Sequence, residues 1–176
     1  NRYGRWMQAI SGIHYNFSMP EAYWQHTWEE AGCPGELADY ISERYLALIR
    51  NFRRISWLLI YLYGASPAVC ASFLRGREDH SLEPFDEEGK SLHLPYGTAL
   101  RMGGLGYNSD AQKGLNVCYN TLDNYVETLS CAIKAPHPGY AHIPFGQNGE
   151  YQQLNDSLLQ IENEFYSPIR PKRVAA

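Results

Sequence analysis

The stretch MQAISGIHYNFSM, residues 7–19, alternates apolar and polar side chains with little interruption. One side carries Met7, Ala9, Ile13, Tyr15, Phe17 and Met19, broken only by Ser11. Successive side chains of a strand point to opposite faces, so one face should pack on a core and the other stay polar. The polar side holds His14 and no lysine, arginine, aspartate or glutamate. We predict a strand over residues 5–19, ended by Pro20.

Three helices are expected from apolar spacing and helix-end signals. Residues 20–31 have proline at the first helical position, and the turn GCPG follows at 32–35. Apolar residues recur three and four positions apart over residues 36–63, which is typical of one long helix, and Gly64 follows as its stop. Residues 119–135 show the same amphipathic spacing.

The other segments are expected to supply strands and turns. Residues 92–101 can be extended, the Asn-Gly pair at 148–149 suits a hairpin, and residues 160–174 alternate as a last strand. Residues 75–92 are polar and acidic, as in an exposed loop. Strands and helices without regular βαβ alternation indicate the α+β class, with a largely antiparallel sheet and flanking helices.

Length, composition and charge limit the classes of function. A chain of 176 residues with 44% hydrophobic content is the size of one domain with a core, and its net charge of −4 argues against nucleic-acid partners. The longest apolar run, residues 57–63, is far below the roughly 20 residues that span a bilayer, so no membrane partner is expected. The chain starts at Asn1 without Met and stops after a strand-like segment. We therefore expect an internal piece of a longer protein.

The four cysteines, Cys33, Cys70, Cys118 and Cys131, lack the spacing of a metal site. No secretory signal is visible, so reduced thiols in the cytoplasm are the expectation. A single bridge between Cys33 and Cys70 is left open.

Polar side chains fall on one face of the predicted last strand. They are Glu162, Glu164, Tyr166, Arg170 and Lys172, and Pro168 lies on the same face. Carboxylates can hold Mg²⁺, which prefers oxygen ligands, and cations can neutralise phosphate or carboxylate groups. The alternative is an ordinary solvated face, which antiparallel sheets commonly present.

Further candidates lie outside that strand. His14 is either a metal ligand or a hydrogen-bonded surface histidine. Arg101 and Tyr107 bracket the glycine turn at 103–107, where they either clamp a carboxylate or serve as a structural pair. The sequence contains no phosphate-loop, nucleophile-elbow or HExxH motif. The patterns alone indicate a polar-faced sheet that binds an anionic small molecule.

Four long blocks resemble one known family. They are MQAISGIHYNFSMP (7–20), GASPAVCASFL (64–74), LPYGTALRMGGLGY (94–107) and QIENEFYSPIRPKRV (160–174). In this order and spacing they are similar to the bacterial glutamate–cysteine ligases, most closely the gamma-proteobacterial type. Four blocks in register are far more specific than one short motif.

The resemblance implies an ATP-dependent ligase that performs the first step of glutathione synthesis. ATP phosphorylates the γ-carboxylate of L-glutamate, and the amine of L-cysteine then attacks the γ-glutamyl phosphate. The implied cofactors are ATP and Mg²⁺, with Mn²⁺ as an alternative metal. The implied fold is a glutamine-synthetase-like catalytic cup, of which residues 1–176 are a single partial domain from the central part.

The resemblance also assigns roles to individual residues. His14 matches a metal-binding histidine at the magnesium–nucleotide site, and Gln8 and Ile10 line the same nucleotide-binding face. Arg101 and Tyr107 match residues of the substrate pocket. Tyr166 matches a tyrosine that contacts cysteine or its adduct. The charged residues Glu162, Glu164, Arg170 and Lys172 lie in a matching block without an individual role.

The implied site is incomplete within these residues. In the family most metal-binding carboxylates lie upstream of the matched segment and further catalytic charges lie downstream, so no catalytic residue is assigned. We expect the 176-residue chain to be inactive alone. The alternatives are a ligase that joins glutamate to another amine and a non-catalytic binding module of the same fold. Because a cut sheet exposes apolar faces, we also expect self-association or marginal stability.

Overall fold

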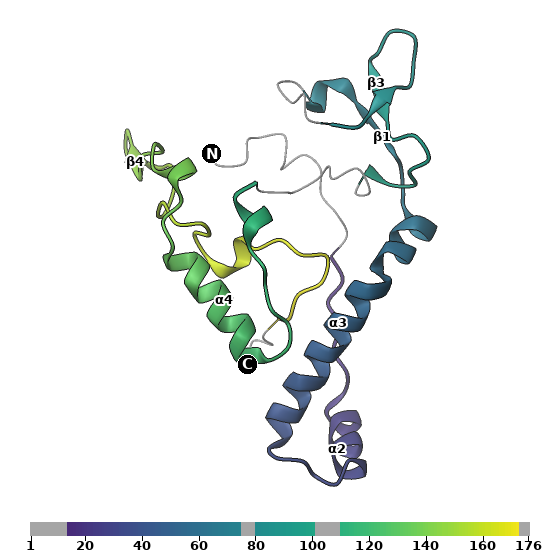
Figure 1. Cartoon of the computed structure of the whole chain (residues 1–176), viewed down its shortest axis with the longest axis vertical. Helices are drawn as coiled ribbons and strands as arrows, with labels where there is room; N and C mark the ends of the chain where they lie inside the picture. Colours follow the sequence, from purple (N-terminus) through teal and green to yellow (C-terminus); the bar gives the residue numbers. More distant parts are fainter. Residues whose placement is uncertain (1–13, 75–79, 101–109, 173–176) are drawn as a thin grey trace.

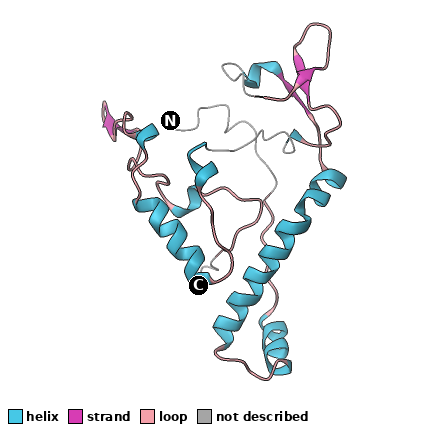
Figure 2. Ribbon diagram, viewed as in Figure 1, coloured by secondary structure: helices cyan, strands magenta, loops and turns pink. Residues whose placement is uncertain are grey.

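The computed structural model describes residues 14–74, 80–100 and 110–172. The helices are α2 (Glu21–Glu30), α3 (Leu37–Tyr63) and α4 (Leu122–Lys134). The strands are β1 (Ala68–Cys70), β2 (Glu83–Pro84), β3 (Ser91–His93), β4 (Gly146–Gln147) and β5 (Glu150–Tyr151). The 3₁₀ turns are η1 (Ala71–Leu74), η3 (Asp110–Gly114), η4 (Pro138–Tyr140) and η5 (Glu162–Glu164). Helices beside small antiparallel sheets confirm the α+β class (Figure 2).

Helices α2 and α3 form a hairpin, as Figure 1 shows. Trp24 is 8% exposed, and its ring lies edge-on to that of Tyr45, with 4.8 Å between ring centroids. The Tyr45 hydroxyl accepts hydrogen bonds from Trp24 Nε1 (3.3 Å) and from the Met19 amide (2.9 Å). The turn between the helices includes Gly32 at φ +81°. All three predicted helices are confirmed, α2 starting one residue after Pro20.

The far end of α3 leads into a three-stranded antiparallel sheet of order β1-β3-β2 (Figure 1). The register pairs Ala68 and Glu83 with His93 on either side of the central strand. Gly64 ends the helix where the chain approaches the backbone of Thr98, whose hydroxyl donates to the Ile60 carbonyl at 3.0 Å. A Cβ on Gly64 would lie 2.4 Å from the Thr98 carbonyl oxygen, so this close approach requires glycine.

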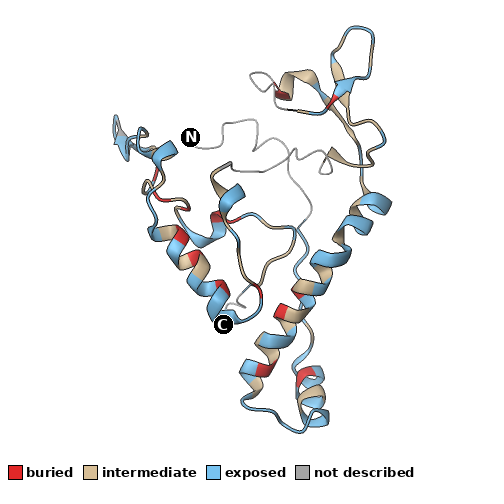
Figure 3. Ribbon diagram, viewed as in Figure 1, coloured by how far each residue is buried: buried red, intermediate tan, exposed pale blue. Residues whose placement is uncertain are grey.

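The hydrophobic core lies between the middle of α3, α4 and the C-terminal segment (Figure 3). Its buried members are Leu46, Ile49, Tyr119, Tyr125, Leu129, Ala132, Leu159 and Phe165. Helix α4 begins with a cap, in which the Thr121 side chain accepts a hydrogen bond from the Asn124 amide at 3.1 Å. The core therefore fixes residues 159–165 against two helices.

Strands β4 and β5 form the hairpin predicted from the Asn-Gly pair. Asn148 and Gly149 have φ values of +55° and +81°. Positive φ at both central residues is the type I′ geometry that matches strand twist.

Two predicted strands are wrong over the residues that the structure describes. Residues 14–19 form no strand, and residues 5–13 lie outside the described part. Tyr15 and Phe17, expected on a core face, are 86% and 54% exposed. Alternation alone does not make residues 14–19 a strand, because a strand also requires a neighbouring strand to accept its backbone hydrogen bonds.

Residues 160–172 form η5 and irregular backbone, where a last strand had been predicted. The Glu164 carboxylate accepts a hydrogen bond from the backbone N–H of Gln160. Pro168 and Pro171 have no amide hydrogen to donate to a neighbouring strand. Of the described residues 92–100, only the first two belong to β3, and Tyr96 follows at φ +60°. The predicted loop over residues 75–92 contributes β2 and the start of β3.

All four cysteines are free, so Cys33 and Cys70 do not form a bridge. Among the described helices, none has the length and apolar character needed to cross a membrane.

Candidate functional site

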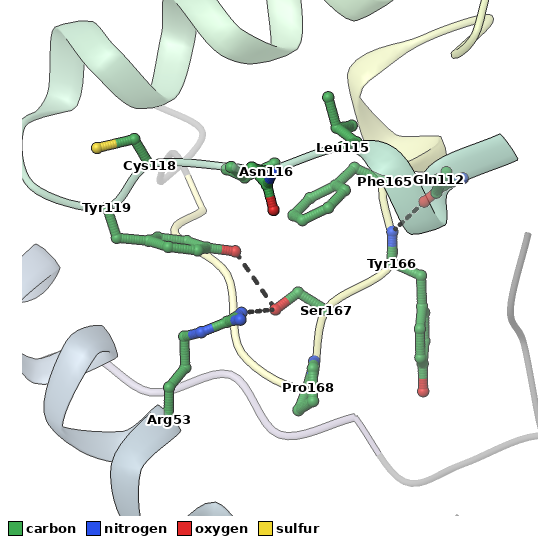
Figure 4. Close-up of a pocket in the computed structure, with 11 residues that line it drawn as sticks. Arg53, Gln112, Leu115, Asn116, Cys118, Tyr119, Phe165, Tyr166, Ser167 and Pro168 are labelled. Atoms are coloured by element: carbon green, nitrogen blue, oxygen red, sulfur yellow. Dashed lines mark hydrogen bonds between the residues drawn. The ribbon is translucent and has the colours of Figure 1, made fainter. Parts of the chain in front are cut away.

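A cavity of about 430 Å³ lies beside α3, between the segment after η3 and the segment after η5 (Figure 4). Its lining residues are Arg53, Gln112, Leu115, Asn116, Val117, Cys118, Tyr119, Phe165, Tyr166, Ser167 and Pro168. Three parts of the chain that are distant in sequence therefore meet there. The cavity has the size of a small-molecule site.

Ser167 is the most connected polar side chain of the cavity wall. Its hydroxyl accepts hydrogen bonds from Arg53 Nη1 at 3.2 Å and from the Tyr119 hydroxyl at 3.3 Å. It donates to the Ile169 carbonyl at 2.8 Å. A serine hydroxyl has one hydrogen to donate and two lone pairs, so Ser167 is saturated and its position is fixed.

The Arg53 guanidinium also stacks on the Tyr119 ring, with its central carbon 5.0 Å from the ring centre. Within the described ranges no carboxylate pairs with Arg53. The cavity wall consequently carries one positive charge supported by an aromatic face and a hydroxyl.

Gln112 holds the backbone on the other side of Tyr166. Its amide nitrogen donates to the Glu164 carbonyl at 3.0 Å, and its amide oxygen accepts from the Tyr166 N–H at 3.1 Å. Figure 4 shows the second of these bonds, made by Gln112 in the middle of η3. One side chain thus bridges two backbone groups of the segment that carries Tyr166.

Tyr166 projects from this held segment. Its side chain lies apart from Phe165, which is 7% exposed in the core, whereas Tyr166 is 38% exposed. In Figure 4 the Tyr166 ring points away from both Gln112 and Phe165, and Ser167 points toward Arg53 and Tyr119. Tyr166 is therefore a lining residue of the cavity whose accessible phenol lies on the opposite side of its segment from the Ser167 hydroxyl.

Behind the cavity, Tyr125 packs against Tyr119 with 5.4 Å between ring centroids. Burial, with a smaller contribution from Tyr119, raises the pKa of Tyr125 to about 12, and nearby Arg170 opposes that rise. Arg170 donates to the carbonyls of Asn163 (3.0 Å) and Phe165 (3.2 Å). Tyr125 is a neutral core residue at physiological pH.

The residues predicted for the site do not all lie at the cavity. Tyr166 lines the cavity, and His14 is exposed on irregular backbone. Gln8, Ile10, Arg101 and Tyr107 lie outside the described residues, so their roles stay predictions. The described part of the chain contains no group of three His, Cys, Asp or Glu side chains that could hold a metal ion.

The charged face expected on residues 160–174 does not exist as a sheet face. Glu164 is buried, and its carboxylate accepts hydrogen bonds from the backbone and side chain of Gln160. Arg170 binds backbone carbonyls. These two residues hold the local backbone of the chain.

Sequence reasoning missed Gln112, Arg53 and Ser167. Gln112 and Tyr166 are 54 residues apart, and Arg53 and Ser167 are 114 apart. The sequence places Arg53 with Arg50 and Arg54 between the apolar positions of the long helix, and nothing local distinguishes it from those two. No pattern singled out Gln112.

Comparisons with known proteins give a consistent result. The family model described as glutamate-cysteine ligase matches residues 1–176. A glutamate–cysteine ligase of Saccharophagus degradans is 56% identical over 176 residues, covering 99% of this chain and 33% of that protein. One of Pseudomonas putida is 57% identical over 173 residues, covering 98% of this chain and 32% of that protein.

A solved structure is similar as well. The crystal structure of a glutamate–cysteine ligase from Francisella tularensis in complex with AMP has a TM-score of 0.83 and 39% sequence identity. The match covers 99% of this chain and 33% of that one. The chain spans about a third of the length of the relatives it matches.

Proposed function

The chain belongs to the glutamate–cysteine ligase family, and from this premise we propose that it is part of the catalytic domain of an ATP-dependent carbon–nitrogen ligase. The proposed reaction joins the γ-carboxylate of L-glutamate to the amine of L-cysteine. ATP transfers its γ-phosphoryl group to the glutamate carboxylate, and the cysteine amine displaces phosphate to form the amide. The observation that carries this proposal is the family match over all 176 residues.

Tyr166 is the described residue that we assign to substrate. It is accessible, it lines the cavity, and its backbone is held on both sides. We propose that its phenol contacts cysteine, with Arg101 and Tyr107 completing the substrate pocket. Holding a nucleophile in line by such contacts lowers the entropic part of the barrier.

Nucleotide binding is proposed from the AMP complex of the Francisella tularensis relative. Gln8 and Ile10 are the residues that we assign to the nucleotide, and His14 to the metal. Mg²⁺ and Mn²⁺ prefer carboxylate and water oxygens, and His14 supplies one nitrogen. The described residues therefore do not make a metal site by themselves, and the remaining ligands must come from other parts of the polypeptide.

Residues 1–176 are proposed to be one partial domain, the central part of the catalytic domain, that cannot catalyse the ligation without the rest. Free thiols at all four cysteines agree with a reducing compartment, and we assign the reaction to the cytoplasm. The proposed partners are small-molecule substrates.

The test is ATP turnover by the full-length polypeptide that carries this segment. ADP release should require both glutamate and cysteine, and the 176-residue chain alone should release none. Turnover with glutamate and another amine, but not with cysteine, would favour the differently specific ligase. Absence of any amine-dependent turnover in the full-length polypeptide would favour the non-catalytic module.

A further inference from the structure

The segment that carries Tyr166 is held at two points, one on each side of that residue. Before it, Gln112 binds the carbonyl of Glu164 and the amide of Tyr166 at 3.0 and 3.1 Å. After it, Ser167 is bound by Arg53 and Tyr119 at 3.2 and 3.3 Å. The backbone is therefore held immediately before and immediately after the Tyr166 side chain.

The chemistry of Gln112 suits this task. Its carboxamide presents an acceptor and a donor side by side, and one orientation of the amide satisfies both backbone partners. A carboxylate in its place would accept from the Tyr166 N–H but would have no hydrogen for the Glu164 carbonyl. Alanine would leave both backbone groups without this partner.

Fixing the backbone fixes the direction of the Tyr166 side chain. Phe165 is buried in the core and Ser167 is tied to Arg53, so both neighbours point away from Tyr166 (Figure 4). The Cα–Cβ direction of Tyr166 then follows from the backbone, and staggered rotamers leave few positions for the ring. Loss of either anchor would give the Tyr166 ring more positions.

We infer that Gln112 is a positioning residue, which orients Tyr166 toward the cysteine substrate through the Tyr166 amide. This inference rests on the proposed function, in which Tyr166 contacts cysteine. A hydrogen bond of ordinary net strength corresponds to about a three- to tenfold change in an equilibrium. Gln112→Ala should therefore raise the KM for cysteine about three- to tenfold and leave the KM for ATP unchanged.

The experiment is a double-mutant cycle in the full-length polypeptide, using Gln112→Ala, Tyr166→Ala and the double variant. If Gln112 acts through Tyr166, Gln112→Ala has no further effect on the KM for cysteine once the phenol has been removed by Tyr166→Ala. Gln25→Ala is the matched control, because Gln25 is exposed on α2 and its side chain bonds Glu29 of its own helix. If Gln112→Ala does not fold, Gln112→Glu carries the same cycle, with a smaller rise in KM because one bond is kept.

The outcomes separate this inference from the proposed function. An equal rise in KM with and without the Tyr166→Ala substitution would show a general structural role and overturn the inference. An unchanged KM for cysteine in Gln112→Ala and Gln112→Glu would overturn it too. A wild-type polypeptide without glutamate- and cysteine-dependent turnover would contradict the proposed function itself.

Discussion

At the scale of single residues, the sequence pointed to Tyr166 but not to what holds it. The family resemblance selected Tyr166 because its block, QIENEFYSPIRPKRV, matches as a whole. Gln112 and Arg53 reach that block only after the chain has folded, across 54 and 114 residues. Local patterns contain no information about such pairings. The raised pKa of Tyr125 is a further property that follows only from the packed core.

Tyr125 gives a prediction at this scale for alkaline pH. Burial raises its pKa from 10.0 to about 12, so folding favours its neutral form. Its contribution to stability is fully present below about pH 10, the pKa of an unfolded tyrosine, and is lost as pH rises through the folded value. Tyr125→Phe removes this ionisation, so its alkaline unfolding midpoint, followed by circular dichroism, should lie at higher pH.

The exposed Tyr151 serves as the control, since it is 86% exposed on the β4–β5 hairpin. Tyr151→Phe should unfold at the same alkaline pH as the unmodified chain. Identical midpoints for Tyr125→Phe and Tyr151→Phe would contradict the account of Tyr125 as a buried neutral phenol.

At the scale of elements, the helices were predictable and most strands were not. A helix satisfies its hydrogen bonds within itself, so the three- and four-residue spacing of α3 and α4 was sufficient evidence. A strand depends on a partner elsewhere in the chain, and the alternation of residues 14–19 and 160–172 could not supply one. The β4–β5 hairpin was predictable because its partner is adjacent and its Asn-Gly turn is local.

Gly64 tests the junction between α3 and the small sheet. At φ −61° its backbone suits any residue, yet an added Cβ would meet the Thr98 carbonyl oxygen at 2.4 Å. Gly64→Ala should therefore lower the free energy of unfolding by about 1–3 kcal/mol, measured by urea denaturation. Gly114→Ala, whose Cβ meets nothing within 4 Å, should change it by less than about 0.5 kcal/mol. Equal effects of the two substitutions would argue against a tight junction.

At the scale of the whole molecule, the last turns of α3 show how the chain relates to its relatives. This end of the helix is apolar on every side, with Trp57, Leu62 and Tyr63 exposed by 66%, 58% and 79%. A helix that is apolar all round normally lies inside a larger structure. Since the chain spans about a third of its relatives, we propose that the rest of the ligase covers this end.

Without that cover, the 176-residue chain should self-associate through the end of α3. Sedimentation velocity should show that particle size increases with concentration. A variant that carries both Trp57→Lys and Leu62→Lys should show a smaller increase. Tyr151→Lys, at an exposed aromatic residue of the β4–β5 hairpin, should leave association unchanged. A single monomeric species at all concentrations would refute this expectation.

The central claim is that this chain belongs to a ligase that activates glutamate as an acyl phosphate. The most direct measurement is an isotope experiment on the full-length polypeptide, with L-glutamate labelled with oxygen-18 in the γ-carboxylate. Because one carboxylate oxygen becomes the bridge to phosphorus and leaves with it, the released inorganic phosphate should carry one labelled oxygen per γ-glutamylcysteine formed. Formation of product with unlabelled phosphate, or no cysteine-dependent phosphate release, would contradict the account.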